Sequence, residues 1–381
     1  MRYLVFSLFI TVATILLLGV HRYLWKRLVR DTEISGRWRQ AATTLLIAGG
    51  LLVPLTLGIA RRMARTHVDL LALGVFAYMG GLLYLVLFLL AWELPRRRAS
   101  SKERRVFLAR AAAGTALAGT TGVVYMGTGN ALGEISTPEI EVPLARLPKA
   151  LDGLKIVQLT DVHIGPILDK RFLKSVVDKV NHLKPDLVVI TGDLVDGAPR
   201  VIGPDVAELA GLKSRWGTYF CTGNHEYYSG ARQWVDFLDQ HGIKTLLNQR
   251  VSIGDAGASF DLAGIPDKQG RLLHESHTPN FAKMMDGRDP ERELVLLSHR
   301  PNPIDEAAKH GVGLQLSGHT HGGQLWPITL ATRLIHPYSE GLHLHQDTSW
   351  IYVSRGTGFW GPPMRIGAPA EITSLILTSK A

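Results

Sequence analysis

The stretch that decides the fold reads KIVQLTDVHIG, residues 155–165. Its first half is mostly apolar, as in a β-strand, and Asp161 and His163 follow at once. Residues i and i+2 that leave a strand point the same way, so this carboxylate and this imidazole can bind one cation. Alone the pair is weak evidence, because a capping aspartate and a hydrogen-bonded histidine are common in proteins without a metal.

The same arrangement recurs along the chain. After a predicted helix over 172–182, the apolar run 185–190 ends in Thr191-Gly192-Asp193. Three further strand-like runs, at 217–221, 293–297 and 313–316, end in Gly-Asn-His-Glu, Ser-His-Arg-Pro and Ser-Gly-His-Thr-His-Gly. The side chains delivered by the five strand ends are Asp161, His163, Asp193, Asn224, His225, His299, His319 and His321. Open α/β sheets bind ligands at this edge, so the pattern predicts one shared site.

In type and order these motifs (DxH, GD, GNH, H, GHxH) resemble those of the calcineurin-like metallophosphoesterases over about residues 154–361. The resemblance implies a four-layer α/β/β/α sandwich with two facing mixed sheets. It also implies a centre of two divalent metal ions. One ion would be held by Asp161, His163 and His321, and the other by Asn224, His299 and His319, with Asp193 bridging them.

The chemistry of these side chains fits that expectation. Carboxylate and amide oxygens with imidazole nitrogens suit Mn²⁺, Fe or Zn²⁺. Two such cations lower the pKa of a shared water, give a hydroxide at neutral pH and clamp a phosphate for in-line attack. His225 follows the ligand Asn224 and is the catalytic candidate, which would protonate the leaving oxygen or stabilise charge in the transition state.

Four neighbouring residues have two explanations each. Asp196 and Glu226 lie next to predicted ligands and could orient their imidazoles, or they could be exposed loop acids. Arg300 and Arg365 could bind a phosphate bidentately, or they could form surface ion pairs.

The first third of the chain has the composition of a membrane domain. Four apolar segments lie at about 3–20, 41–60, 68–92 and 106–127, and each can cross about 30 Å of hydrocarbon as a helix. The fourth is rich in Ala, Gly and Thr and contains Arg110. Buried helices of a soluble protein are the alternative, which fits poorly with three such runs separated by arginine clusters. We therefore expect a membrane domain at 1–128, a proline-containing linker at 129–150 and a metallophosphoesterase domain at 151–381.

Charge divides along the same boundary. The chain has 42 Lys and Arg against 33 Asp and Glu, and a formal net charge of +9. Residues 1–128 hold 17 basic and 5 acidic side chains, whereas residues 129–381 hold 25 and 28. A nuclease would need a basic groove in its catalytic part, so we expect no nucleic-acid partner. The single Cys221 excludes an intramolecular disulfide.

Basic residues also predict the topology. Six lie in the connection 21–40 and seven in 93–110, against four at the opposite ends of the segments. Because cytoplasmic loops retain Lys and Arg, this pattern predicts a multi-pass protein of the cell (inner) membrane whose catalytic domain is extracytoplasmic. The run SKERRVFL, residues 101–108, resembles a twin-arginine export signature, although an ordinary positive cluster explains it as well. No clean cleavage site follows, so the fourth segment is expected to stay in the protein.

These features predict a membrane-anchored enzyme that hydrolyses a phosphate ester or a pyrophosphate bond. The chain most resembles the bacterial membrane-anchored branch of the family, which includes twin-arginine-exported proteins and putative UDP-2,3-diacylglucosamine pyrophosphatases. A tether on the membrane favours a lipid-linked or envelope substrate and contact with membrane lipid, which is an inference from location. The resemblance to twin-arginine-exported proteins implies the twin-arginine export machinery as a partner. A non-catalytic metal-binding sensor or scaffold is the alternative, which the full set of seven ligands disfavours. Monoester or diester preference and the identity of the metals stay open.

Overall fold

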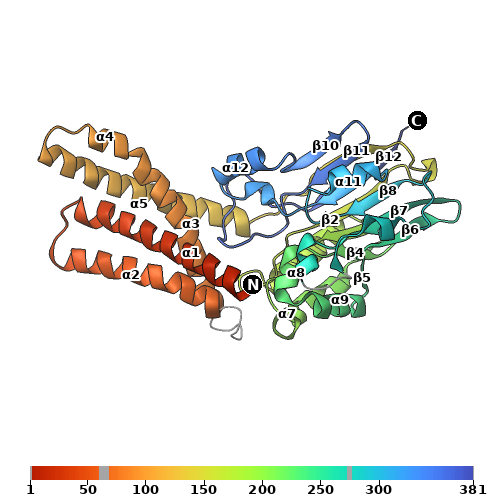
Figure 1. The fold of residues 1–381 in the computed structure, drawn as a ribbon, viewed down its shortest axis with the longest axis horizontal. Coiled ribbons are helices and arrows are strands. Elements are labelled where there is room, and N and C mark those ends of the chain that lie inside the picture. Colours follow the sequence, from red (N-terminus) through yellow and green to blue (C-terminus); the bar gives the residue numbers. More distant parts are fainter. Residues whose placement is uncertain (1, 60–67, 273–276, 381) are drawn as a thin grey trace. The chain divides into compact units, whose positions relative to one another are not determined.

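The computed structural model describes residues 2–59, 68–272 and 277–380, which fall into two compact units (Figure 1). The helical unit comprises Met1–Gly129 with Gly361–Met364. The α/β unit comprises Asn130–Trp360 with Arg365–Ala381. Each is described by itself.

The helical unit contains a helix at each of the four apolar segments. The helices are α1 (Arg2–Trp25), α2 (Gly36–Ile59), α3 (Val68–Ala91), the short α4 (Glu93–Arg97) and α5 (Lys102–Leu132). Ala60, the last residue of the second predicted segment, lies outside the described residues. Within the described ranges, two helices are long and apolar enough to cross a membrane, at Leu71–Ala91 and Lys102–Leu132. Four crossings therefore stay a prediction.

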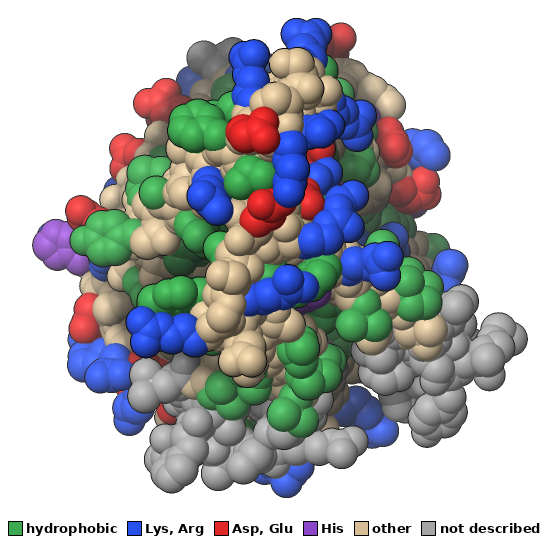
Figure 2. All heavy atoms as spheres, turned by 90° about the vertical axis from the view of Figure 1, so that its left-hand side faces the viewer, with side chains coloured by type: hydrophobic (Ala, Val, Ile, Leu, Met, Phe, Trp, Pro, Cys, Tyr) green, Lys and Arg blue, Asp and Glu red, His purple; other side chains and the backbone are tan. Residues whose placement is uncertain are grey.

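Ion pairs join the two basic connections of the helical unit. Arg27 Nη1 lies 2.7 Å from Asp31 Oδ2, and Arg27 Nη2 lies 2.6 Å from Glu93 Oε1. Arg96 Nη2 reaches the same oxygen of Asp31 at 2.7 Å. Figure 2 views this end, where Lys and Arg side chains gather with a few Asp and Glu between them. We call Arg27, Asp31, Glu93 and Arg96 the arginine cluster.

The described residues of the α/β unit form two six-stranded mixed sheets. The first has the order β1 (Glu139–Leu144), β12 (Thr373–Ser379), β2 (Leu154–Leu159), β3 (Leu187–Thr191), β4 (Thr218–Cys221) and β5 (Ile243–Thr245). The second has the order β10 (Gly341–His345), β11 (Ser349–Val353), β9 (Leu314–Ser317), β8 (Leu294–Leu297), β7 (Ala258–Gly264) and β6 (Gln249–Asp255). Strands β2 to β5 pair in parallel, as do β7, β8, β9 and β11. Parallel pairing places the carboxyl ends of these strands at one edge.

Alternating side chains build the layers. Ile156 and Val189 of the first sheet pack with Leu297 and Leu316 of the second in one buried cluster, so the sheets face each other. The opposite face of the first sheet packs on α6 (Lys170–His182), α7 (Pro199–Val206) and α9 (Ala231–Gln240). That of the second packs on α10 (Phe281–Met285) and α11 (Ile304–Lys309). The predicted α/β/β/α order is confirmed.

The segment 129–150, expected to be a linker, belongs to the α/β unit from Asn130 onward. It contributes β1, which lies at the edge of the first sheet and pairs in parallel with β12. Pro143 lies opposite Thr378 in this pairing, as an edge strand allows. The prolines mark an extended segment, as expected, but the segment is paired in the sheet and not free.

Candidate metal centre

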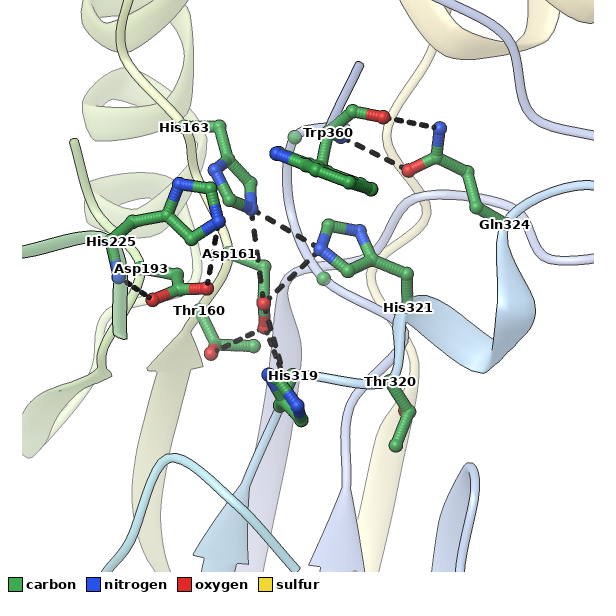
Figure 3. Close-up of polar contacts among 12 residues, drawn as sticks. Thr160, Asp161, His163, Asp193, His225, His319, Thr320, His321, Gln324 and Trp360 are labelled. Carbon is green, nitrogen blue, oxygen red and sulfur yellow. Dashed lines mark hydrogen bonds and ion pairs between the residues drawn. The ribbon is translucent and has the colours of Figure 1, made fainter. Parts of the chain in front are cut away.

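Loops at five strand ends bring the predicted ligands together between the sheets. Asp161, His163 and His321 form one group, and Asp193, His299 and His319 form another. In each group the ligand atoms lie within 4.8 Å of one another. Figure 3 shows several of these side chains pointing toward one another from separate loops. The structure thus gathers six of the seven predicted metal ligands into two groups.

In the first group, three donor atoms point toward one another. His321 Nε2 lies 3.2 Å from Asp161 Oδ1 and 3.2 Å from His163 Nε2. His163 Nε2 lies 4.0 Å from the same carboxylate oxygen. All three residues are buried. Two imidazole nitrogens and a carboxylate oxygen that face one another away from water are a donor set suited to a divalent cation.

In the second group, His299 presents a lone nitrogen to a carboxylate. Its Nδ1 lies 2.8 Å from the Thr191 carbonyl oxygen, to which it can donate, and its Nε2 lies 3.1 Å from Asp193 Oδ2. That Nε2 atom is buried and has no hydrogen bond within the described residues. Burial by itself lowers the pKa of His299, but the charge of Asp193 raises it to about 10. Asp193 therefore stabilises a positive charge beside His299 Nε2, which a proton or a bound cation can supply.

The two acids of these groups are ionised. Burial by itself raises the pKa of Asp161, but the charge and hydrogen bond of His321 hold it well below its usual range. The pKa of Asp193 is likewise lowered against burial, chiefly by His299. Two buried carboxylates that stay negative need a cation nearby.

Asn224, the seventh predicted ligand, contacts a guanidinium. Arg300 Nη2 donates to Asn224 Oδ1 at 2.9 Å, and Arg300 Nη1 lies 2.6 Å from His319 Nε2. Asp267 accepts from Arg300 Nε at 2.6 Å. Burial, then the charges of His299 and Arg300, lowers the pKa of His319 to about 2, so its ring is neutral and can accept. Asn224 Oδ1 and His319 Nε2 thus face the cationic guanidinium of Arg300, and the same two lone pairs could bind a divalent cation.

The backbone at these ligands is unusual. Five of the seven have a positive φ: Asp161 (51°), His163 (53°), Asp193 (49°), His319 (71°) and His321 (52°). Left-handed backbone at non-glycine residues costs of order 1–3 kcal/mol each and gathers at functional sites. The motif glycines make room for these loops. A Cβ at Gly192 would lie 2.5 Å from the Gly223 nitrogen, and one at Gly223 would overlap the Asp193 carboxylate.

His225, the predicted catalytic residue, lies at the start of α8 (Asn224–Ser229) beside both groups. Its Nδ1 contacts Asp196 Oδ1, and its backbone N–H donates to Asp193 Oδ1 at 2.8 Å. Asp196 Oδ2 also lies 3.1 Å from His163 Nδ1, so this acid contacts two imidazoles. Burial lowers the pKa of His225, but the hydrogen bond to Asp196 raises it to about 9, which suits a proton donor.

Glu226 and Arg365 stabilise backbone. Glu226 accepts from the backbone N–H groups of Asp193, Leu194 and Gly223 at 3.0, 2.8 and 2.6 Å, and so contacts no ligand imidazole through these bonds. Arg365 is 1% exposed and donates to the carbonyls of Gly356, Gly358 and Ala368. Within the part of the chain that the structure describes it forms no ion pair, and a phosphate would have to displace these hydrogen bonds.

Two features of the site lay outside the sequence predictions. Asp267, which binds Arg300, follows strand β7, so the rule that found the other ligands applies to it as well. The second is the exposed ring of Tyr228, whose centroid lies 5.4 Å from that of His225. The exposed ring of Trp360 has its centroid 6.1 Å from that of His225. The adjacent Phe359 is buried in the core.

Known proteins are similar to this chain in sequence. Residues 154–323 match the family described as calcineurin-like phosphoesterase. A Bos taurus protein named "Transmembrane protein with metallophosphoesterase domain" is 40% identical over 299 residues, 76% of this chain and 67% of its own length. A Danio rerio protein of the same name is 33% identical over 398 aligned positions, 98% of this chain and 89% of its own. A solved dimetal phosphatase from Danio rerio covers 54% of this chain and 88% of its own, at 14% identity and a TM-score of 0.35.

Proposed function

This chain belongs to the calcineurin-like phosphoesterases, a family of metal-dependent phosphoester hydrolases, and from that premise we propose that it is a membrane-anchored enzyme with a two-metal centre. The observation that carries the proposal is the convergence of buried Asp and His side chains from separate strand ends. The bond cleaved is a phosphate ester or a pyrophosphate bond, in a substrate of the cell envelope or one linked to lipid.

The ligand assignment follows the two groups of donors. Asp161, His163 and His321 would hold one ion. Asp193, His299 and His319 would hold the other, and Asn224 is assigned to it from its place in the GNH motif. When bound, divalent cations of the Mn, Fe or Zn type supply Lewis-acid activation of water and of phosphate oxygens.

His225 acts as the proton donor to the leaving oxygen. Its hydrogen bond to Asp196 fixes the ring and favours the protonated form at neutral pH. Its backbone N–H donates to Asp193, so the loop that carries this proton donor also positions Asp193.

The membrane part of the proposal rests on three observations. Two helices of the described chain are long and apolar enough to span, and the Danio rerio relative that covers 98% of the chain is named a transmembrane protein. The basic residues of the helical unit lie mainly in two connections, which ion pairs join. We assign four crossings, an extracytoplasmic α/β unit and entry by the twin-arginine machinery.

The enzymatic part is tested with the full chain in detergent, because β1 belongs to the sheet and a fragment starting at residue 151 would lack it. Asp193→Asn and His319→Ala are expected to abolish Mn²⁺-dependent hydrolysis of bis-p-nitrophenyl phosphate and to leave the chain folded. The matched control is Asp178→Asn, an exposed acid on α6. Wild-type rates in both site variants would show that the centre is not catalytic, and a folded wild-type chain without turnover would favour a sensor.

The topology is tested separately. Alkaline phosphatase fused after Gly133 should be active, since this reporter works only outside the cytoplasm. An inactive fusion would place the α/β unit on the cytoplasmic side.

A further inference from the structure

The α/β unit exposes large apolar side chains unevenly. Among its described residues, ten large hydrophobic side chains are exposed: Leu132, Tyr228, Leu272, Trp326, Ile328, Leu330, Leu334, Ile335, Leu344 and Trp360. Five of the ten lie between residues 326 and 335, in α12 (Ile328–Ile335) and just before it. Exposed apolar side chains gathered in so short a segment indicate a binding surface.

The helix α12 has its apolar and polar sides reversed. Leu334 is 88% exposed and Ile335 is 73% exposed, whereas Thr329 is buried and Thr332 partly so. A helix that covers a domain turns its apolar side inward. Here the threonines face the protein and the leucine and isoleucine side chains face outward. The apolar face of α12 therefore needs a partner outside the α/β unit.

This helix packs directly on the metal-ligand loop. A Cβ at Gly323, two residues after His321, would lie 2.5 Å from Thr329 Cα, so loop and helix backbones touch. The next residue, Gln324, donates to the Trp360 carbonyl and accepts from the Trp360 N–H, both at 3.0 Å. Figure 3 shows Trp360 beside His163 and His321. An apolar helix and an exposed indole are thus both fixed to the loop that carries a predicted metal ligand.

The covalent connection indicates which partner is available. Ala131, in the last turn of α5, and Ile135 are buried in the core of the α/β unit. The backbone of Ser136 already pairs with that of Ala370, 3.1 Å from N to O. Only residues 133–135 separate the end of α5 from this pairing, and they can span about 10 Å. If α5 crosses the membrane, the α/β unit cannot leave the lipid surface.

We propose that the outward face of α12, together with Trp326, enters the interfacial layer of the lipid bilayer and brings the metal centre to phosphoesters carried by membrane lipids. Interfacial segments bury their apolar side chains about 5–10 Å into the headgroup and acyl boundary, where Trp is also favoured. The substrate class is an amphiphile whose phosphate reaches the centre beside Trp360 while its acyl chains stay in the bilayer. The substrate class in this inference rests on the proposed function. The membrane contact of α12 does not depend on it.

The membrane contact is tested without turnover. Leu334→Cys in the full chain is labelled with an environment-sensitive nitrobenzoxadiazole dye, in nanodiscs of phosphatidylcholine and phosphatidylglycerol; the native Cys221 is buried. We expect blue-shifted emission and quenching by doxyl-labelled acyl chains. A dye at Lys174→Cys, an exposed position on α6, should show neither. The inference would be overturned if the dye at residue 334 emitted like the dye at residue 174, both with an intact metal centre and in combination with Asp193→Asn.

The substrate class is tested with two probes that share one leaving group. p-Nitrophenyl hexadecyl phosphate in nanodiscs should have a kcat/KM about ten-fold above that of soluble p-nitrophenyl methyl phosphate. Leu334→Gln combined with Ile335→Gln should remove this preference, and Leu334→Met combined with Ile335→Leu should keep it. Equal ratios in all three proteins would overturn the substrate class. Failure of wild type to hydrolyse either probe would instead contradict the proposed function, while the dye measurement still decides the membrane contact.

Discussion

The arginine cluster of the helical unit holds two partly buried acids and the metal centre of the α/β unit holds two fully buried ones, and different groups balance the acids in each. In the arginine cluster, Asp31 and Glu93 face the permanent charges of Arg27 and Arg96 at 2.6–2.7 Å. In the metal centre, Asp161 and Asp193 face histidines, whose charge depends on a proton. In the first cluster the chain's own arginines balance the acids, whereas the second calls for an added cation.

This difference separates structural from functional polar groups. Changing the arginine cluster should alter stability and leave the chemistry alone. Changing the metal centre should alter the chemistry and the response to metal, with little loss of the fold. Four experiments test that separation, from the largest expected effect on turnover to the smallest.

Metal removal should have the largest effect. Chelation is expected to lower turnover by about 10³-fold or more, because water activation and phosphate binding are lost together. Metal returned at about 100 times its Kd should stabilise the α/β unit by about 2.7 kcal/mol, measured by thermal unfolding. Asp193→Asn should lose this metal-dependent gain and Glu93→Gln should keep it. An equal gain in Asp193→Asn would remove the distinction between the two clusters.

His225→Gln comes next. We expect turnover to fall about 10²- to 10⁴-fold while the metal-dependent stabilisation is retained, because the side chain donates a proton and is not a ligand. The loss should be larger for an alkyl leaving group than for p-nitrophenolate, which needs little protonation. Equal losses for the two leaving groups would contradict the role of proton donor.

Asp196→Asn should have an intermediate effect, about 10- to 100-fold on turnover, since this acid orients His163 and His225 without being assigned to a metal. Metal affinity and turnover are measured on the same preparation. Asp178→Asn provides the matched control at an exposed carboxylate of α6. A variant indistinguishable from this control would show that Asp196 orients neither ring.

Glu93→Gln should change turnover least. Hydrolysis of soluble bis-p-nitrophenyl phosphate is expected to stay within about two-fold, while the helical unit loses about 2 kcal/mol because Arg27 loses a charged partner. Unfolding in detergent, followed by circular dichroism, measures the loss. A large drop in turnover without a loss of stability would link this cluster to catalysis.

Local patterns in the sequence were sufficient to predict that strand ends gather most of the candidate ligands, and the four-layer fold was predicted from the family resemblance that these motifs carry. Each ligand directly follows an apolar strand, so periodicity and residue type are read within a few positions, as at Asp161 or His299. Strand β1 was missed because its place beside β12 depends on residues more than 200 positions away. The outward orientation of α12 could not be predicted either, because apolar residues in a short helix normally indicate a face that is buried against the protein.

The partners of the two arginines could not be identified from residue type. Arg365 is buried because the carbonyls of Gly358 and Ala368, both within seven residues of it in the chain, accept from its guanidinium. Arg300 contacts Asn224 and His319 because Asp267, from another strand end, holds it there. Residue type alone could therefore not show whether an arginine is buried in hydrogen bonds to the protein or exposed at the surface.

The left-handed backbone at five of the proposed metal ligands sets a trade-off between stability and activity at these positions. Glycine adopts a positive φ without strain, so replacing His319 or His321 by glycine would relieve the backbone while it deletes a ligand. Variants selected for thermal tolerance in the absence of metal would gain by losing these side chains. Selection for heat resistance in this protein should therefore include a screen for turnover in every round.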